Sequence, residues 1–428
     1  MEIKFHGAAR EVGRSSIKVS SKEADILLDC GIKLDPMGVI YPYELDDLVD
    51  VDEIFISHAH LDHTGALPFL NYYGNKSRIF STKMTKKVAE ILLKDSYKIS
   101  KIENHKLPYS SKNIKSVLDR FEDYLQFNKT YSIRKDLDVE VFDSGHIPGS
   151  CSFLFNFKKE GKTLLYTGDF NTTKTKLLSG SKFEKLKERD VDVLITESTY
   201  GDKSHPNRDE TVKRFKELIK KRTEVGPVLI PVFAVGRSQE ILMTVSEMDL
   251  DVPIYFDGMA KQVTKIYMKH PEFVRDIKEL KKASSSVNFA NRSLDYSKLS
   301  NERCVFITTS GMISGGPSLS IFEDIFKNPE ATVLLTGYQA EETHGRDLLE
   351  DGIFEKDGVE KKVQCLYEKF DFSAHTGLDD LKKTIDDISP KKVIIQHGDE
   401  SSGENFKNYL DEKGIESILP KIGESIKI

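Results

Sequence analysis

The segment from Ser57 to His63 constrains this chain more than any other part of it. Its letters, SHAHLDH, place three imidazoles and one carboxylate within six residues, directly after the apolar, strand-like run at 53–56. Imidazole and carboxylate side chains together suit zinc and similar divalent ions. One short loop can hardly surround a single ion with four ligands, so these side chains are better divided between two ions. A pair of ions held in this way is typical of hydrolytic sites.

Length and composition place the chain among ordinary globular proteins. Its 428 residues are enough for two or three domains at ~150 residues each. Hydrophobic residues make up 38% and charged residues 31%, which is usual for a soluble protein. No run approaches the ~20 apolar residues that cross a bilayer, and the first residues lack the layout of a signal peptide. We therefore expect a cytoplasmic protein without a membrane partner.

Cysteine spacing and net charge exclude two further classes. The four cysteines show no C-x-x-C pairing, so a disulfide framework or a zinc ribbon is not expected, and we interpret them as small core residues. The net charge of −6 means that no global basic field favours nucleic acid. A local basic groove, or bound metal ions, would still attract phosphate groups.

Secondary-structure patterns divide the chain into parts of different texture. The N-terminal part alternates short apolar strands with turns, and helical periodicity appears at 86–93 and again from 114 to 124. From about residue 200, strands and helices alternate, as at 228–243 and 252–268, which predicts a separate α/β domain with a parallel sheet. Short strands return near residue 370 and end at 392–398.

Four further polar residues follow apolar strands, where rigid scaffolds usually present their chemistry. They are Asp29, His146, Asp169 and His397. A single His or Asp in such a place is more often structural, and His6, His105, His205 and His270 are interpreted in that way. The group of four is different because the short loop already supplies several ligands and lacks only partners from elsewhere.

This pattern of ligands resembles the metallo-β-lactamase superfamily. The resemblance implies that one zinc ion takes His58, His60 and His146, that a second takes Asp62, His63 and His397, and that Asp169 bridges the two. It also implies that Asp29 orients the histidine loop from behind, as outer carboxylates do. The alternative is a single closed zinc site, which would leave about three ligand candidates without a role.

Six ordered motifs narrow the resemblance to the β-CASP nucleases. They are TESTYG at 196–201, PVFAVGRSQE at 231–240, TSGMISGG at 309–316, TGYQAEETHGR at 336–346, FSAH at 372–375 and QHG at 396–398. The resemblance implies an α/β protein: a metallo-β-lactamase αββα sandwich (1–200 and 366–428) with an inserted α/β β-CASP domain (201–365). The segments REVGRSS and LLDCGI look most like the endonuclease subunit of the eukaryotic cleavage and polyadenylation factor and its archaeal relatives. A histidine at position 397 is typical of RNA-directed members of the family.

The resemblance also suggests a mechanism for RNA hydrolysis. Water activated by the metal ions would attack the phosphodiester, and His375 would protonate the leaving oxygen while Glu197 holds its ring. His375 and Glu197 are thus the expected catalytic pair, with Asp62 and Asp29 in support. Possible RNA or phosphate contacts are Ser310, Gly311, Met312, Ser373 and Arg237. The Gly-rich loop is about as consistent with a plain βα turn, and Arg237 with a structural ion pair.

Three readings of the function stay open at this point. The leading one is a zinc-dependent ribonuclease of RNA processing or decay, either endonucleolytic or 5′→3′ exonucleolytic like RNase J relatives. The others are a catalytically silent RNA-binding subunit and a small-molecule hydrolase on the same fold. The expected partners are RNA, a second copy of the chain in a homodimer, and other RNA-processing, transcription or translation machinery.

Overall fold

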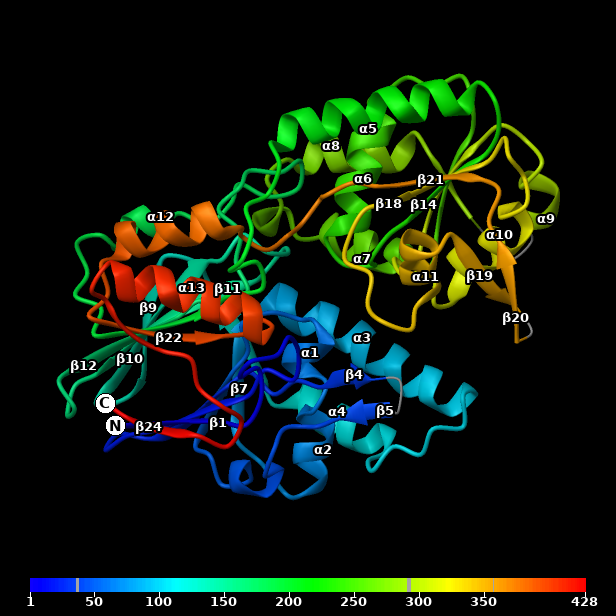
Figure 1. Cartoon of the computed structure of the whole chain (residues 1–428). Coiled ribbons are helices and arrows are strands. Elements are labelled where there is room, and N and C mark those ends of the chain that lie inside the picture. The colour runs from blue at the N-terminus through cyan, green and yellow to red at the C-terminus, as the bar shows by residue number, and fades with distance from the viewer. Residues whose placement is uncertain (36–37, 291–293, 357) are drawn as a thin grey trace. The chain divides into compact units, whose positions relative to one another are not determined.

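The computed structural model of the chain describes residues 1–35, 38–290, 294–356 and 358–428. These residues form two compact units (Figure 1). The first unit contains residues 1–173, 180–204 and 375–428, and the second contains residues 174–179 and 205–374. The second unit is therefore an insertion within the first. The domain limits expected from the motifs, 200/201 and 365/366, stay a prediction.

Two mixed sheets of seven strands form the centre of the first unit. One sheet has the order β24 (Ser425–Lys427), β1 (Glu2–Phe5), β2 (Ile17–Ser20), β3 (Asp25–Leu28), β6 (Glu53–Phe55), β7 (Arg78–Thr82), β8 (Phe121–Leu125). The other has the order β23 (Glu416–Ile418), β22 (Lys392–Gln396), β13 (Val193–Glu197), β12 (Lys162–Tyr166), β11 (Cys151–Phe157), β10 (Leu137–Asp143), β9 (Lys129–Arg134). In each sheet one half is parallel and the other antiparallel.

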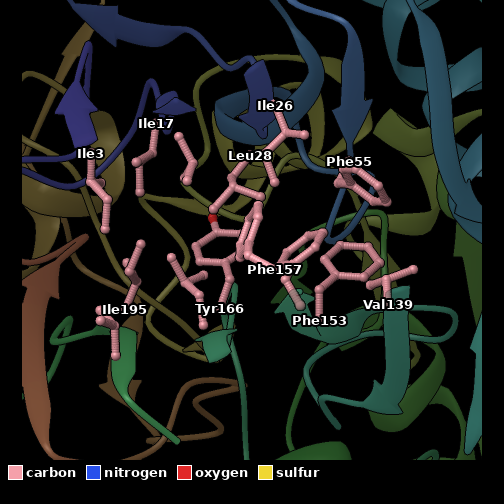
Figure 2. Close-up of a cluster of buried hydrophobic side chains, with 14 of the residues drawn as sticks. Ile3, Ile17, Ile26, Leu28, Phe55, Val139, Phe153, Phe157, Tyr166 and Ile195 are labelled. Carbon is pink, nitrogen blue, oxygen red and sulfur yellow. The ribbon is translucent and has the colours of Figure 1, made fainter. Parts of the chain in front are cut away.

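The main core lies between these two sheets (Figure 2). Side chains alternate along each strand, so Leu137, Val139 and Val141 of β10 all face inward. Phe55 of β6 meets Phe153 and Phe155 of β11, with ring centroids 5.5 and 4.9 Å apart. Offset and edge-on contacts of this kind favour aromatic packing beyond the area that they bury. The core therefore holds the two sheets face to face.

Helices cover the outer faces of both sheets. The first sheet packs against α2 (Leu67–Tyr72), α3 (Lys83–Ile102) and α4 (Ser111–Asp119), near the short α1 (Leu61–Thr64) and the turn η1 (Leu45–Leu48). The second sheet packs against α12 (Leu378–Ile388), α13 (Glu400–Glu412) and the turn η2 (Phe183–Leu186). A small antiparallel pair, β4 (Lys33–Asp35) and β5 (Gly38–Ile40), completes the unit. The expected αββα sandwich is confirmed.

The helix expected from 114 to 124 is wrong in its second half. Helix α4 ends at Asp119, and Phe121–Leu125 form strand β8 at the edge of the first sheet. Phe121 and Leu125 are buried, and β8 runs parallel to β7. Tertiary pairing with an open sheet edge decides this segment, because its local pattern fits either structure.

The second unit is a parallel α/β sheet, as expected. Its strand order is β16 (Asn288–Phe289), β15 (Ile254–Asp257), β17 (Val305–Thr308), β14 (Val228–Pro231), β18 (Thr332–Leu335), β21 (Leu366–Lys369). The connecting segments hold α5 (Arg208–Thr223), α6 (Arg237–Ser246), α7 (Ala260–Tyr267), η3 (Pro271–Phe273), α8 (Ile277–Ser285), α9 (Tyr296–Leu299), α10 (Gly316–Ile325), α11 (His344–Glu350) and the hairpin β19 (Ile353–Lys356) and β20 (Val359–Lys362).

The four cysteines are buried without disulfide bonds, and the described helices are too short or too polar for a membrane. All four are core residues with free thiols, as expected: Cys30, Cys151, Cys304 and Cys365. Throughout the described part of the chain, each helix is too short or too polar to cross a bilayer.

Candidate metal centre

The histidine loop begins at the carboxyl end of β6 in the first sheet. Strand β3 is the parallel neighbour of β6, so Asp29, just after β3, lies beside Ser57. The loop then turns into the short helix α1, which carries Asp62 and His63. Gly31 allows this turn to pack closely, because a Cβ there would lie 1.6 Å from the carbonyl oxygen of Asp62.

The second sheet presents its site residues in the same way. β12, β13 and β22 are parallel neighbours, and Asp169, Glu197 and His397 lie at or just beyond their carboxyl ends. His146 comes from the turn between β10 and β11. Two site residues, Asp29 and His397, have left-handed backbones with φ of 58° and 48°. Such φ values are uncommon outside glycine and are concentrated at functional sites.

Three histidines form the first cluster. His58, His60 and His146 each offer a ring nitrogen, and these atoms all lie within 4.8 Å of one another. Nδ1 of His60 is 3.0 Å from Nε2 of His58 and 3.2 Å from Nε2 of His146. Three convergent imidazole nitrogens are a usual ligand set for a catalytic zinc ion.

The second cluster contains Asp62, His63, Asp169 and His397, again with ligand atoms within 4.8 Å. Oδ2 of Asp169 is 3.3 Å from Nε2 of His63, and Oδ1 is 3.4 Å from Nδ1 of His397. The same Oδ2 is also 3.6 Å from Nε2 of His58 in the first cluster. Asp169 therefore lies between the two clusters.

Buried polar atoms without hydrogen bonds test whether a metal fits here. Both carboxylate oxygens of Asp169 and Nε2 of His63 are buried, and none of the three takes part in a hydrogen bond with the residues that the structure describes. Buried polar atoms nearly always have a partner, and a cation satisfies such atoms as well as a hydrogen bond does. The nitrogen and oxygen donors match zinc. The site therefore fits metal ions.

Burial and neighbouring charges shift the pKa values of ligands in both clusters. Burial lowers the pKa of His58 well below its ordinary value and that of His60 to about 4, so both rings are neutral near pH 7. Burial acts in the same direction on His63, but Asp169, Asp29 and Asp62 outweigh it and raise its pKa. Burial disfavours the charged form of Asp169, yet the neighbouring His397 and His63 hold its pKa well below the ordinary value.

A third histidine–carboxylate pair lies next to these clusters. Nδ1 of His375 is 2.8 Å from Oε2 of Glu197, which is fully buried. Oε1 of Glu197 accepts from the backbone N–H of Phe170 at 2.7 Å, and Oε2 also accepts from Oγ1 of Thr199 at 2.6 Å. The ring of His375 stacks at a tilt against His146, with centroids 4.6 Å apart.

The carboxylates near His375 keep its ring charged. Burial lowers its pKa, but Glu197 and then Asp169 and Asp62 outweigh this and raise it to about 9. His375 also groups with His146 and Asp169 as a third set of possible metal ligands. Sequence reasoning expected His375 only as a proton donor.

The expected RNA contacts all belong to the second unit. Ser310, Gly311 and Met312 lie in the loop from β17 to α10, where Oγ of Ser310 accepts from the N–H of Ser314 at 2.9 Å. The backbone N–H of Ser373 donates to Asp371 at 2.9 Å. These assignments stay predictions.

Arg237 has the surroundings of a structural residue. Its side chain is buried, its Nη1 is 3.8 Å from Oε2 of Glu240, and its guanidinium lies 5.9 Å from the ring centroid of Phe372. Both interpretations of Arg237, as an ion pair and as an RNA contact, stay predictions. His6, His105, His205 and His270 belong to none of the possible metal clusters among the described residues.

Sequence reasoning missed three side chains that hold the site together. Thr199 contacts Glu197 and lies 3.3 Å from Nδ1 of His397. Ser57 and Tyr166 both donate to the carboxylate of Asp29. Thr199 stood within a recognised motif, and Ser57 opened the histidine loop, but Tyr166 carried no signal beyond its place in an apolar strand.

Comparisons with known proteins agree with this geometry. The metallo-beta-lactamase superfamily domain matches residues 18–199, the Beta-Casp domain matches 238–348, and the Zn-dependent metallo-hydrolase RNA specificity domain matches 360–420. The chain is 42% identical to the probable RNase MJ4 of Methanocaldococcus jannaschii, with all of both chains covered. It is 33% identical to the RNase aCSPSF2 of Saccharolobus solfataricus, with all of this chain and 85% of the relative covered.

A solved structure shares the fold at low sequence identity. The crystal structure of a protein of unknown function from Enterococcus faecalis superposes with a TM-score of 0.62 at 16% identity, over 99% of each chain. Taken with the close relatives and the domain matches, these findings show that the chain belongs to the β-CASP family of the metallo-β-lactamase superfamily.

Proposed function

We propose that this chain is a two-zinc ribonuclease that hydrolyses phosphodiester bonds of RNA. The observation that carries the proposal is the meeting of two ligand clusters at Asp169, with the pair His375 and Glu197 beside them. The RNA-specificity domain at 360–420 contains both His375 and His397, and the relatives at 42% and 33% identity are named as RNases. These facts support RNA over a small molecule as the substrate.

Seven side chains would hold the metal ions. His58, His60 and His146 would hold one zinc ion, Asp62, His63 and His397 the other, and Asp169 would contact both. When bound, two such ions lower the pKa of a water molecule and stabilise the negative charge that develops on the phosphate. The carboxylates of Asp62 and Asp169 would balance part of the charge of the ions.

His375 is the proposed proton donor to the leaving oxygen. Its Nδ1 contacts Glu197 at 2.8 Å, so we assign the transfer of the proton to Nε2. Glu197 is itself held by Phe170 and Thr199, which fixes the direction of the imidazole. A general acid of this kind contributes ~10²–10⁴ in rate.

Residues of the second unit are proposed to bind the RNA. Ser310, Gly311, Met312, Ser373 and Arg237 remain the proposed RNA or phosphate contacts. The Gly-rich loop supports this in one respect, because backbone N–H groups in such turns can hold phosphate oxygens. A homodimer, an association with RNA-processing or transcription machinery, and a cytoplasmic location stay predictions.

Digestion of a single-stranded RNA labelled at its 5′ end tests the function and the mode of cleavage. The purified chain, loaded with zinc, is expected to degrade the RNA and to leave a DNA of the same sequence largely intact. A labelled mononucleotide as the first product indicates 5′→3′ exonuclease action, whereas longer labelled fragments indicate endonuclease action. If the zinc-loaded chain leaves the RNA intact, the silent RNA-binding subunit becomes the better description.

A further inference from the structure

The buried carboxylate of Asp29 is linked by hydrogen bonds to a histidine of each ligand cluster. Its Oδ1 accepts from the backbone N–H of Ser57 at 2.7 Å. Its Oδ2 accepts three further hydrogen bonds, from Oγ of Ser57 at 2.7 Å, Nδ1 of His63 at 2.7 Å and the hydroxyl of Tyr166 at 2.6 Å. Four hydrogen bonds hold the Asp29 side chain in one rotamer.

These hydrogen bonds decide which nitrogen of two histidines faces the ligands. Because the Asp29 carboxylate only accepts, Nδ1 of His63 donates to it, and Nε2, which lies 3.3 Å from Asp169, is the ring nitrogen that faces the second cluster. Ser57 gives its own proton to Asp29, so its oxygen accepts from Nδ1 of His58 at 3.1 Å. Nε2 of His58 is then free to face the first cluster.

Asp29 therefore reaches a ligand in each cluster by a different route. It contacts His63 of the second cluster directly, and it contacts His58 of the first cluster through Ser57. Outer partners of this kind orient metal-bound histidines, and their loss typically costs ~10–100-fold in metal affinity.

Tyr166 is the donor that ties Asp29 to the second sheet. It is the last residue of β12, three positions before Asp169, and it is fully buried in the core between the sheets. Figure 2 shows its ring among apolar side chains with the hydroxyl oxygen directed toward the sheet of Ile26 and Leu28. Ser15 lies 3.2 Å from that oxygen and can donate to it while Tyr166 donates to Asp29.

We propose that Tyr166 is a positioning residue that, through Asp29, sets the metal affinity of both clusters at once. The inference rests on the ligand assignment of the proposed function. Three donors converge on Oδ2, and Tyr166 is the one that comes from the opposite sheet. Without its hydroxyl, the carboxylate keeps only donors from the histidine loop itself, so the directions of the His63 and His58 rings are fixed less tightly in both clusters.

Two variants separate this coupling from a local effect. Tyr166→Phe removes one oxygen and keeps the ring that fills the core, so we expect ~10-fold weaker zinc binding at both clusters. Ser57→Ala removes the route to His58 together with one donor to Asp29, and it leaves the bonds of Asp29 with His63 and Tyr166, so we expect the weaker binding chiefly in the first cluster. Tyr267→Phe is the matched control, since Tyr267 is equally buried but lies in the second unit.

Competition with a chromophoric zinc chelator measures the affinity of each site in the wild type and the three variants. Cobalt-substituted protein supplies a second readout, because its visible spectrum reports ligand geometry. We expect both binding steps to shift in Tyr166→Phe, one step in Ser57→Ala and none in Tyr267→Phe, with the circular dichroism of all four proteins alike.

Other results would contradict the role of Tyr166, the ligand assignment or the proposed ribonuclease activity. Wild-type affinity in Tyr166→Phe, or a change at one site alone, overturns the inference. A wild-type chain that binds no zinc overturns the ligand assignment and the inference with it. A wild-type chain that binds zinc but leaves RNA intact contradicts the proposed ribonuclease, whereas the inference is still decided by the binding curves of the variants.

Discussion

Replacing Glu197 by glutamine changes one atom and removes one charge. Glu197 accepts from the backbone of Phe170 on one oxygen and from Thr199 and His375 on the other. Glutamine has a single oxygen, and the N–H of Phe170 cannot move, so the amide NH₂ must face the other two groups. Thr199 has another acceptor, the carbonyl of His397 at 3.0 Å. His375 has to accept at Nδ1 instead, as a neutral ring.

The size of the effect follows from the charge of that ring. Burial alone would lower the pKa of His375, and Glu197 is the first of the groups that raise it from 6.5 to about 9. The rise in pKa from 6.5 to about 9 corresponds to ~3 kcal/mol in favour of the imidazolium, summed over Glu197, Asp169 and Asp62 and net of burial. Without Glu197, His375 is a poor acid near pH 7.5, and we expect cleavage to fall by the ~10²–10⁴ that a general acid contributes.

Single-turnover cleavage of a 5′-labelled RNA measures this loss in Glu197→Gln, His375→Ala and the double variant. Because the two residues act as a unit, the double variant should be no slower than His375→Ala. An RNA whose leaving oxygen is replaced by sulfur needs little protonation, so on it all three should approach the wild type. Glu53→Gln, at a buried glutamate paired with Arg78, serves as the control.

Either of two results would contradict this role of Glu197. One is a Glu197→Gln variant with zinc content and cleavage rate both within a few-fold of the wild type. The other is an equal loss on the oxygen and sulfur substrates, because that would place the role of Glu197 in folding or metal binding. Zinc content per chain is therefore measured for each variant.

Three other perturbations have definite expected outcomes. Removing zinc with a chelator should abolish RNA cleavage and lower stability by ~4 kcal/mol for each zinc ion lost, relative to zinc at 1,000 times its Kd, and added zinc should restore both, as followed by melting curves. Phe55→Ala should cost ~3–5 kcal/mol of unfolding free energy in urea, because Phe55 contacts Phe80 and Phe153 at centroid distances of 5.1 and 5.5 Å; a loss below ~1 kcal/mol would contradict this packing. Burial raises the pKa of Asp371, but its hydrogen bond with His205 at 2.9 Å outweighs this and lowers the value to about 2. The ionised carboxylate therefore stabilises the fold above about pH 4 and ceases to do so as the pH falls through about 2, so Asp371→Asn should lose ~1–2 kcal/mol at pH 7 and clearly less at pH 3.

Metal-dependent hydrolysis could be predicted from the sequence because the ligand side chains follow recognisable apolar strands. Imidazoles and a carboxylate in one short loop can do little else than bind metal ions, and Asp29, His146, Asp169 and His397 follow apolar runs that were recognisable as strands. Strand–helix alternation predicted the separate α/β unit, whereas the αββα sandwich was implied by the family resemblance that the ordered motifs carry. Local patterns sufficed for the strands and the ligand types, since strand alternation and ligand chemistry depend on near neighbours.

Only the tertiary structure decided how those residues meet. His375 and Glu197 are 178 positions apart, and they come into contact because Phe170 bonds to both segments: its carbonyl accepts from the N–H of Thr376 at 2.9 Å and its N–H donates to Glu197 at 2.7 Å. The segment 121–125 became a strand for a similar reason, since the edge of β7 was open to it.

Tyr166 is the clearest case of a role that local pattern could not show. In the sequence it is one more buried aromatic residue of an apolar strand, and its hydroxyl acquires a function only because packing of the two sheets brings Asp29 within 2.6 Å. A hydrogen bond between distant segments depends on the positions of both partners to within a few tenths of an ångström. Residue types and spacing therefore indicated a metal-dependent hydrolase, and the packing of its sheets determined which side-chain atoms meet at the site.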